Sequence, residues 1–296
     1  MKRWNARYPN RFDLRTEDDY LKWRDEKLAA YPKNVGELVV ELGDMTALTT
    51  AEKGKILETV ELANMCVYTA GSAELEMNSL LALGQQLGVS HTDKSSRHMQ
   101  SDELTDSGIL NRAIPFSTRH CNWHTDATYY GSDKTIQALF LLCKRPAVEG
   151  GSNKVLDHEV LYIHLRDKDP GALEVLMNKG CFNYRNPTTG EIDMHLGGKV
   201  FWTNADGHLC HRFSFRKTDM AWSEDGDVVA ARKAMESLIS GEARHVIEGR
   251  LESGMGLVSN NVLHTREKLV DSDDAAHKRL LFRGRFYDRV NPEYLG

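Results

Sequence analysis

Several features that mark other protein classes are missing from this chain of 296 residues. Its five cysteines are odd in number and scattered, and no C-x-x-C pair occurs. The cysteines therefore predict neither a disulfide framework nor a structural zinc site, and they suit a reducing cytosol. No Gly-x-Gly-x-x-Gly sequence or phosphate loop is present either, so no motif supports nucleotide-dependent chemistry.

A surplus of positive charge and long apolar runs are also lacking. The 38 Lys and Arg and the 43 Asp and Glu give a formal net charge of −5, which does not favour a nucleic-acid or anionic-membrane partner. No apolar run approaches the roughly 18 residues that a transmembrane helix needs, and the basic first residues lack the apolar core of a signal peptide. With 41% hydrophobic residues, the chain is predicted to be a soluble globular protein of the cytoplasm.

One stretch, residues 122–130, carries a metal-binding pattern with His124-Thr125-Asp126 at its centre. The aromatic and β-branched residues around it favour a strand. Side chains two residues apart lie on the same side of a strand, so His124 and Asp126 can point at one metal ion. His264 is the best candidate for a third ligand. Two histidines and one carboxylate form the facial triad of non-haem Fe(II) oxygenases, which leaves positions open for substrate and O2.

The same three letters recur at His91-Thr92-Asp93. With 12 histidines in the chain, about one H-x-D sequence is expected from composition alone. The second copy lies in a polar run that is typical of a loop, whereas His124 lies in a segment that favours a strand. We therefore place the metal site at His124 rather than at His91.

Hydrophobic periodicity predicts alternating helices and strands along the rest of the chain. The expected helices cover about residues 16–30, 50–62, 75–87, 157–165, 169–177 and 227–239. The expected strands cover about residues 38–42, 65–69, 135–143, 154–156, 200–203, 212–216, 245–251, 254–260 and 278–287. Residues 149–153 predict a tight turn that needs the freedom of two glycines. The polar residues 89–112 predict a mobile loop or a lid over a site.

Two of the expected strands carry arginines at alternate positions. Arg212 and Arg216 share one face of residues 212–216, and Arg279, Arg283 and Arg285 share one face of residues 278–287. A row of arginines usually marks a solvated face. It can instead bind an acidic ligand, because the planar guanidinium makes bidentate contacts with a carboxylate.

Together these segments resemble the TauD/TfdA family of Fe(II)/2-oxoglutarate dioxygenases, which includes taurine dioxygenase and γ-butyrobetaine hydroxylase. The matching segments, in the order of the family, are residues 123–126, 150–151, 260–264 and 279–283. The resemblance spans about residues 114–290. It implies a mainly β fold with flanking helices and a double-stranded β-helix (jelly-roll) core of the clavaminate synthase type. It also implies one dioxygenase domain over residues 1–296, with 1–112 as an N-terminal helical and β decoration and 113–290 as the catalytic core.

The resemblance implies roles for individual residues. Three residues fall at the positions of the iron ligands: His124, Asp126 and His264. Arg279 falls where the family pairs an arginine with the C5 carboxylate of 2-oxoglutarate, and Asn153 falls beside it, where relatives have Thr or another small polar residue. Arg283 falls where taurine dioxygenase binds the acidic group of its substrate, and it could hold either substrate or cosubstrate. Ala127 replaces the Gly of many relatives.

The implied cofactors are Fe(II), 2-oxoglutarate as cosubstrate, and O2. The family couples decarboxylation of 2-oxoglutarate to succinate and CO2 with oxidation of a substrate. Because Asp126 is intact, hydroxylation, desaturation or oxidative cleavage is expected rather than halogenation. Two alternatives stay open, namely a zinc-dependent hydrolase that uses the same triad and a non-catalytic jelly-roll binding protein.

The expected partner is a small polar organic molecule. Arg212, Arg216 and Arg283 suggest that it carries a carboxylate, sulfonate or phosphonate. Tyr129 and Tyr130 could instead form an aromatic wall for a cationic amine. Neither a nucleic-acid nor a membrane partner is expected, and assembly into a homo-oligomer stays open.

Overall fold

The structure is a computed structural model that describes residues 4–93, 103–105, 117–130, 134–185, 189–215, 220–241 and 244–291. The chain forms two compact units, each built from segments that are far apart in the sequence. One unit combines Met1–Tyr31, Trp123–Thr135 and Leu156–Val246, and the other combines Pro32–Asn122, Ile136–Val155 and Ile247–Gly296. Within the described ranges, no helix has both the length and the apolar character needed to cross a membrane.

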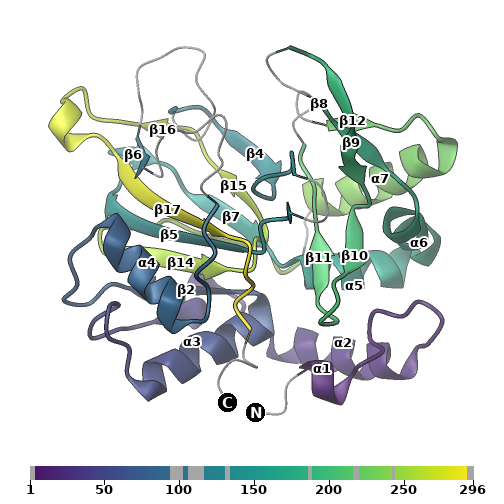
Figure 1. Ribbon diagram of the computed structural model, residues 1–296, viewed down its shortest axis with the longest axis horizontal. Coiled ribbons are helices and arrows are strands. Elements are labelled where there is room, and N and C mark those ends of the chain that lie inside the picture. Colours follow the sequence, from purple (N-terminus) through teal and green to yellow (C-terminus); the bar gives the residue numbers. More distant parts are fainter. Residues whose placement is uncertain are drawn as a thin grey trace. The chain divides into compact units, whose positions relative to one another are not determined.

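The second unit contains a six-stranded sheet in the order β1-β2-β14-β5-β17-β3 (Figure 1). Its strands are β1 (Val39–Val40), β2 (Met65–Thr69), β14 (Met255–Ser259), β5 (Ala138–Arg145), β17 (Leu280–Phe286) and β3 (Glu103–Leu104). β1 pairs with β2 in parallel, and the other neighbours are antiparallel. The sheet therefore joins early and late segments of the sequence.

Two helices supply most of the helical side of the core of this unit, α3 (Thr50–Ala63) and α4 (Met77–Gln86). A capping box between Thr49 and Glu52 begins α3. Ile56 and Leu80 of the helices belong to one buried cluster with Phe140 and Phe286 of the sheet. The predicted apolar helix faces are thus confirmed as core. Among its described residues the unit also contains the short 3-10 helices Val35–Leu38 and Ala275–His277.

A four-stranded sheet has the order β13-β7-β15-β4. Its strands are β13 (Ile247–Gly249), β7 (Asn153–Leu156), β15 (Leu263–Arg266) and β4 (Cys121–His124). Beside it, β6 (Glu149–Gly150) pairs with β16 (Leu269–Val270). β15 and β4 are neighbours, and each carries one of the histidines predicted to bind a metal.

The described part of the first unit contains the α-helices α1 (Trp4–Arg7), α2 (Asp18–Ala30), α5 (His158–Lys168), α6 (Pro170–Asn178) and α7 (Gly226–Ser240). A three-stranded sheet has the order β12 (Met220–Trp222), β8 (Phe182–Arg185) and β9 (Ile192–Gly198). β10 (Phe201–Thr203) and β11 (Leu209–His211) form a hairpin. Asp157 caps α5 by accepting a hydrogen bond from Glu159 N–H, at the start of the helix expected over residues 157–165.

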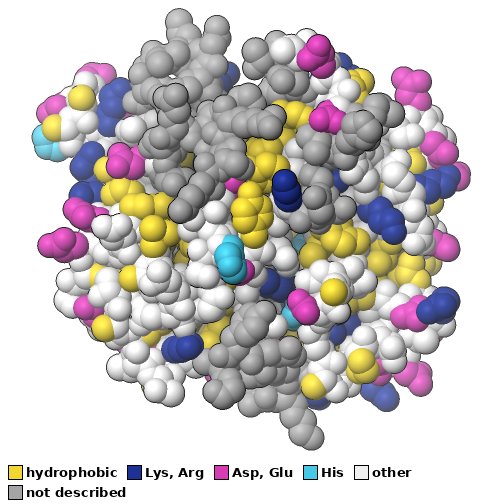
Figure 2. All heavy atoms as spheres, viewed as in Figure 1, with side chains coloured by type: hydrophobic (Ala, Val, Ile, Leu, Met, Phe, Trp, Pro, Cys, Tyr) yellow, Lys and Arg dark blue, Asp and Glu magenta, His cyan; other side chains and the backbone are white. Residues whose placement is uncertain are grey.

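The charges of the surface are mixed. On the face in Figure 2, acidic and basic side chains of the described residues are interspersed, and neither sign forms a continuous patch. A field of one sign that would attract a polyanion is therefore not evident on this face.

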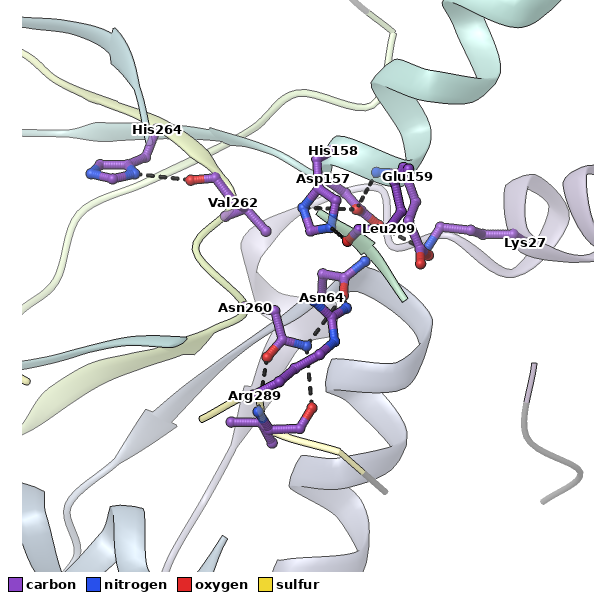
Figure 3. Close-up of polar contacts among 11 residues, drawn as sticks. Lys27, Asn64, Asp157, His158, Glu159, Leu209, Asn260, Val262, His264 and Arg289 are labelled. Carbon is purple, nitrogen blue, oxygen red and sulfur yellow. Dashed lines mark hydrogen bonds and ion pairs between the residues drawn. The ribbon is translucent and has the colours of Figure 1, made fainter. Parts of the chain in front are cut away.

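α2 is tied to α5 by a buried ionic cluster (Figure 3). Lys27 Nζ lies 2.8 Å from Asp157 Oδ2 and 2.6 Å from Glu159 Oε2, and all three side chains are buried. Burial alone would raise the pKa of Glu159, but the charges of Lys27 and Arg11 outweigh it and lower this pKa to about 2. An unpaired charge at this depth would be strongly destabilising. Because Lys27 on α2 supplies the paired charge, α2 is an integral part of its unit.

Two strand predictions are wrong, and most of residues 89–112 lie outside the described residues. The expected strand 212–216 is not formed in its described part, since β11 ends at His211 and Ser214 makes only an isolated bridge with His124. The expected strand through Asp126 ends early, because β4 stops at His124 and the chain then turns. Of the predicted loop or lid, the structure describes 89–93 and 103–105, where Glu103–Leu104 forms β3 instead.

Candidate metal centre

His124 and Asp126 lie close together, but by a different route from strand alternation. Asp126 begins a turn, and Ala127 has a left-handed φ of +58° that reverses the chain direction. Asp126 Oδ1 lies 3.6 Å from His124 Nε2, and both side chains are buried. Gly would adopt this positive φ without strain, whereas Ala adopts it at a cost.

The backbone of residues 213–215 supports this motif. Thr125 N–H donates to the Phe213 carbonyl at 2.9 Å, and Phe213 N–H donates to Thr125 Oγ1 at 3.2 Å. Phe215 N–H donates to the Trp123 carbonyl at 2.9 Å. The residues on either side of His124 are therefore held by the main chain of a segment about 90 positions later.

His264 lies on β15, and its ring is oriented by the residue just before that strand. Nδ1 of His264 lies 3.0 Å from the carbonyl oxygen of Val262. Because a carbonyl can only accept a hydrogen bond, Nδ1 carries the proton and Nε2 keeps its lone pair. This tautomer is the one that can bind a metal through Nε2.

The structure brings the three predicted ligands together. His124, Asp126 and His264 each offer one ligand atom, and these atoms all lie within 4.8 Å of one another. The two imidazole nitrogens and one carboxylate oxygen are the donor set of a non-haem Fe(II) site. The donor chemistry and the spacing therefore fit such an ion.

The second H-x-D sequence is used differently. His91 Nδ1 lies 2.7 Å from Asp288 Oδ1, and its side chain is 77% exposed. Asp93 is buried and pairs with Arg285 at 2.9 Å, while Tyr287 donates to it at 3.0 Å. His91 and Asp93 thus face separate partners, which agrees with the choice of His124.

Arg279 is a buried cation just before β17. Its backbone N–H donates to Asp271 Oδ1 at 2.6 Å, but its guanidinium makes no hydrogen bond or ion pair in the part of the chain that the structure describes. Burial and the nearby charge of Arg266 lower its pKa to about 10. Asp271 lies near enough to act on this charge, but no carboxylate of the described residues pairs directly with the guanidinium, so this site suits an anion.

Sequence reasoning missed Arg266. It is buried near Arg279, and its guanidinium donates to the Ser117 carbonyl at 2.7 Å. Strand alternation could have found it, because Arg266 lies two residues after His264 on β15 and shares its side of the strand.

Asn153 begins β7, after the turn at Gly150 and Gly151. Both glycines have positive φ, +67° and +77°, which confirms the predicted tight turn. The Asn153 Nδ2 donates to the Gly151 carbonyl at 3.2 Å. On β17, Arg283 is buried opposite Leu141.

The faces of β17 follow the predicted alternation. Leu281 packs with Leu104 and Cys143, whereas Phe282 and Phe286 belong to the main core cluster. Arg283 and Arg285 are nevertheless buried rather than solvated. The surface interpretation of this arginine row is therefore wrong.

Arg212 contacts protein carbonyls. Its guanidinium donates to the carbonyls of Tyr130 and, at 3.0 Å, Gly197, and it lies 4.8 Å over the Phe182 ring. Burial lowers its pKa to about 10. These contacts support the turn that follows Asp126.

The tyrosine pair at the end of that turn makes an aromatic contact. The rings of Tyr129 and Tyr130 meet edge to face with their centroids 4.7 Å apart, and the ring centroid of Tyr129 lies 6.0 Å from that of Tyr184. Arg216, the other arginine predicted to contact substrate on this segment, lies outside the described residues.

The sequence model of the taurine catabolism dioxygenase TauD, TfdA family matches residues 39–285. The chain belongs to this family. The resemblance inferred from the sequence is thereby confirmed, and the match includes all three metal-ligand candidates. α1 and α2 of this TauD/TfdA family member lie before the matched range.

Two curated proteins share sequence with this family member. A uridine-5'-phosphate dioxygenase of an Amycolatopsis species is 29% identical over 157 residues, which cover 52% of this chain and 56% of that protein. A uridine-5'-phosphate dioxygenase of a Streptomyces species is 30% identical over 169 residues, which cover 54% and 59%. The matched regions therefore span little more than half of each relative.

Solved structures share the fold at low sequence identity. The non-haem iron oxygenase OrfP, solved with Fe and α-ketoglutaric acid, has a TM-score of 0.62 at 13% identity and covers 84% of this chain and 83% of its own. An asparagine oxygenase, solved with Fe(II), 3-hydroxyasparagine and succinate, has a TM-score of 0.58 at 10% identity and covers 96% and 90%. Mixed sheets with flanking helices thus give this TauD/TfdA protein the fold of non-haem iron oxygenases.

Proposed function

We propose that this protein is an Fe(II)- and 2-oxoglutarate-dependent dioxygenase that oxidises a small polar molecule. The observation that carries the proposal is the convergence of ligand atoms of His124, Asp126 and His264 within 4.8 Å. Membership of a dioxygenase family and the fold of non-haem iron oxygenases support it. Hydroxylation, desaturation and oxidative cleavage are all compatible with this donor set.

The three ligands would hold Fe(II) on one face. The ion would supply open positions at which 2-oxoglutarate and O2 react to give succinate, CO2 and an oxidised substrate. The chain supplies orientation: Val262 fixes the tautomer of His264, and the turn at Ala127 directs the Asp126 carboxylate toward His124. Burial of His124 and Asp126 limits access of water to the ligands.

Arg279 is proposed to bind the far carboxylate of 2-oxoglutarate. The carboxylate would form a direct ion pair with the buried guanidinium, which no acidic side chain of the described residues makes. Asn153 would stand beside it and could donate a second hydrogen bond, in place of the hydroxyl that relatives use.

The proposed architecture of the core is a double-stranded β-helix. The antiparallel pairings β14–β5 and β5–β17 and the separate four-stranded sheet that contains β7, β15 and β4 support it. In such a core, two sheets enclose the site from opposite faces.

Uridine-5'-phosphate is the proposed first substrate to test. Two relatives that share about 30% identity over half of the chain carry that activity in their names. Its phosphate is an acidic group of the kind expected from the arginine-rich strands, and Arg283 is the residue proposed to bind it.

Succinate release tests the proposal. The purified protein, supplied with Fe(II), 2-oxoglutarate and O2, should release more succinate with uridine-5'-phosphate than with uridine, which lacks the phosphate. Stimulation by another acidic small molecule but not by uridine-5'-phosphate would reject this substrate and keep the activity. Absence of 2-oxoglutarate binding to the Fe(II)-loaded protein would reject the activity itself.

A further inference from the structure

The short connection between β14 and β15 contains two buried asparagines, Asn260 and Asn261, shortly before the proposed ligand His264. Figure 3 shows Asn260 with its polar partners. β14 ends at Ser259 and β15 begins at Leu263, so only residues 260–262 join them. Asn260 is 4% exposed and Asn261 is 5% exposed. The resemblance to the family pointed to this segment, but the proposed iron and 2-oxoglutarate contacts give neither asparagine a role.

Asn260 connects the turn to two distant segments. Its backbone N–H donates to the Asn64 carbonyl at 2.8 Å, and its Nδ2 donates to Asn64 Oδ1 at 3.2 Å. The same Nδ2 lies 3.3 Å from the Val290 carbonyl, and Val290 N–H donates to Asn260 Oδ1 at 3.1 Å. Arg289 donates to Asn64 Oδ1 from the other side at 2.5 Å. One carboxamide thus fixes the turn against the end of α3 and the C-terminal segment.

Asn261 sets the direction of the turn. It has a left-handed φ of +49°, a conformation that Asn tolerates better than other residues with a side chain. Its Nδ2 donates to the Ile136 carbonyl at 2.8 Å. This hydrogen bond holds the reversal in place just before Val262.

The fixed turn determines where the Val262 carbonyl points. That carbonyl accepts the Nδ1–H of His264 at 3.0 Å and so sets both the tautomer and the ring orientation of the ligand. Partners of this kind are known to control metal affinity, because they keep the coordinating nitrogen unprotonated and aimed.

We propose that Asn260 and Asn261 are positioning residues for His264, which act through the Val262 carbonyl to present Nε2 to the metal. This inference rests on the proposed metal site, and it assigns to the two asparagines a function beyond fold stability. It predicts that removal of either carboxamide weakens metal binding more than it weakens the fold.

Asn261→Gly is the sharpest variant. Gly keeps the positive φ without strain, so the change removes the carboxamide and its hydrogen bond to Ile136 and spares the backbone conformation. The control is Asn204→Gly, because Asn204 Oδ1 also accepts hydrogen bonds within a turn, from His208 N–H at 2.9 Å and Asp206 N–H at 3.1 Å, in the β10–β11 hairpin. Asn260→Ala is the companion variant for the second carboxamide.

Titration of the metal-free proteins with Co²⁺, followed by its visible absorption, measures the effect. Asn261→Gly should raise the Kd at least about 10-fold, while Asn204→Gly should leave it within about twofold of wild type. Thermal unfolding of the metal-free variants shows whether the fold persists. If Asn261→Gly lowers the unfolding temperature but leaves the Co²⁺ Kd unchanged, the inference is overturned, because the asparagines would then contribute to stability alone.

Two further readouts separate the possible failures. Wild type should bind Co²⁺ and His264→Ala should not. If wild type fails to bind Co²⁺, the proposed metal site is wrong. If wild type binds and Asn261→Gly binds equally tightly, the metal site stands and this inference alone is wrong. The ring ¹⁵N shifts of His264 in the metal-free wild-type protein test the inference without any variant in the turn. They should report the Nδ1–H tautomer, and an Nε2–H tautomer would overturn it.

Discussion

His124 Nε2 and Asp126 Oδ1 lie 3.6 Å apart, although a turn rather than one continuous strand carries the two residues. The position of the carboxylate therefore depends on the left-handed backbone at Ala127. The strength of the metal site should follow the conformational preference of that single residue.

Substitutions at Ala127 should separate backbone strain from chemistry. Ala127→Gly should raise the free energy of unfolding by about 1 kcal/mol, because Gly has no steric penalty at positive φ. Ala127→Val should lower it by about 1–3 kcal/mol and weaken metal binding, since a β-branched residue resists this conformation. Urea denaturation and Co²⁺ titration measure the two effects. Equal stability of the Gly and Val variants would contradict the assigned strain.

Lys27 should be essential to its unit. Lys27→Met leaves Asp157 and Glu159 buried without their cation and should lower the free energy of unfolding by about 3–5 kcal/mol. Arg24→Met is a matched control, because Arg24 pairs with Asp167 at 3.1 Å at a partly exposed position. That control should change stability by less than about 1 kcal/mol in urea denaturation. Similar effects of the two changes would show that the buried cluster is not special.

The same cluster predicts acid sensitivity. The pKa of Glu159 is lowered from 4.5 to about 2 in the fold, so its ionised form stabilises the native state above pH 4.5. This contribution should be lost as the pH falls from 4.5 toward 2. The slope of unfolding free energy against pH in that window should be smaller in Glu159→Gln than in wild type. An unchanged slope would assign the acid sensitivity to other carboxylates.

Arg279 should act on 2-oxoglutarate and not on the metal. Arg279→Ala should weaken 2-oxoglutarate binding by 2 kcal/mol or more, roughly 30-fold, because a charge-assisted contact is removed from a buried position. Co²⁺ affinity should stay near wild type. Arg145→Ala is the control, since Arg145 lies on β5 and its Nε donates only to the Lys278 carbonyl in the described contacts. Equal losses in both variants would contradict a specific role for Arg279.

Arg212 is expected to stabilise the fold around the metal site, whereas Arg283 is expected to bind substrate. Arg212 donates to the Tyr130 and Gly197 carbonyls, so Arg212→Ala should lower the melting temperature and weaken metal binding. Arg283→Ala should instead raise the KM for an acidic substrate by about 10-fold or more, as expected when one charged contact of about 1.5–3 kcal/mol is lost. Steady-state succinate release measures the KM. If neither variant alters substrate binding, the acidic-substrate proposal fails.

Local signals were enough to predict much of the fold. The cap at Thr49, the cap at Asp157 and the apolar faces of α3 and α4 depend on residues within a few positions of each other. The grouping of His124, Asp126 and His264 was also predictable, because these residue types are the donor set that an iron ion requires. The alternation of β17 was also predictable, because it depends on neighbouring positions alone. Leu281 and Phe282 lie on opposite faces of the strand.

Other features depend on distant contacts and could not be predicted. A positive φ at Ala127 is set by the surrounding fold, so the pattern wrongly continued the strand through Asp126. The burial of Arg212 depends on carbonyls at residues 130 and 197, and the burial of Arg266 depends on residue 117. Arginines on alternate strand positions look solvent-exposed in sequence until such partners are known.

The most direct test of the proposed metal site is an anaerobic titration with Fe(II) followed by 2-oxoglutarate. Chelation of iron by the keto acid at an open facial triad should give a weak visible charge-transfer band. The band should disappear in His124→Ala and persist in His91→Ala, because only His124 shares its ligand atoms with Asp126 and His264. A band that survives His124→Ala, or tight Zn²⁺ binding with no band in wild type, would contradict the proposed iron site.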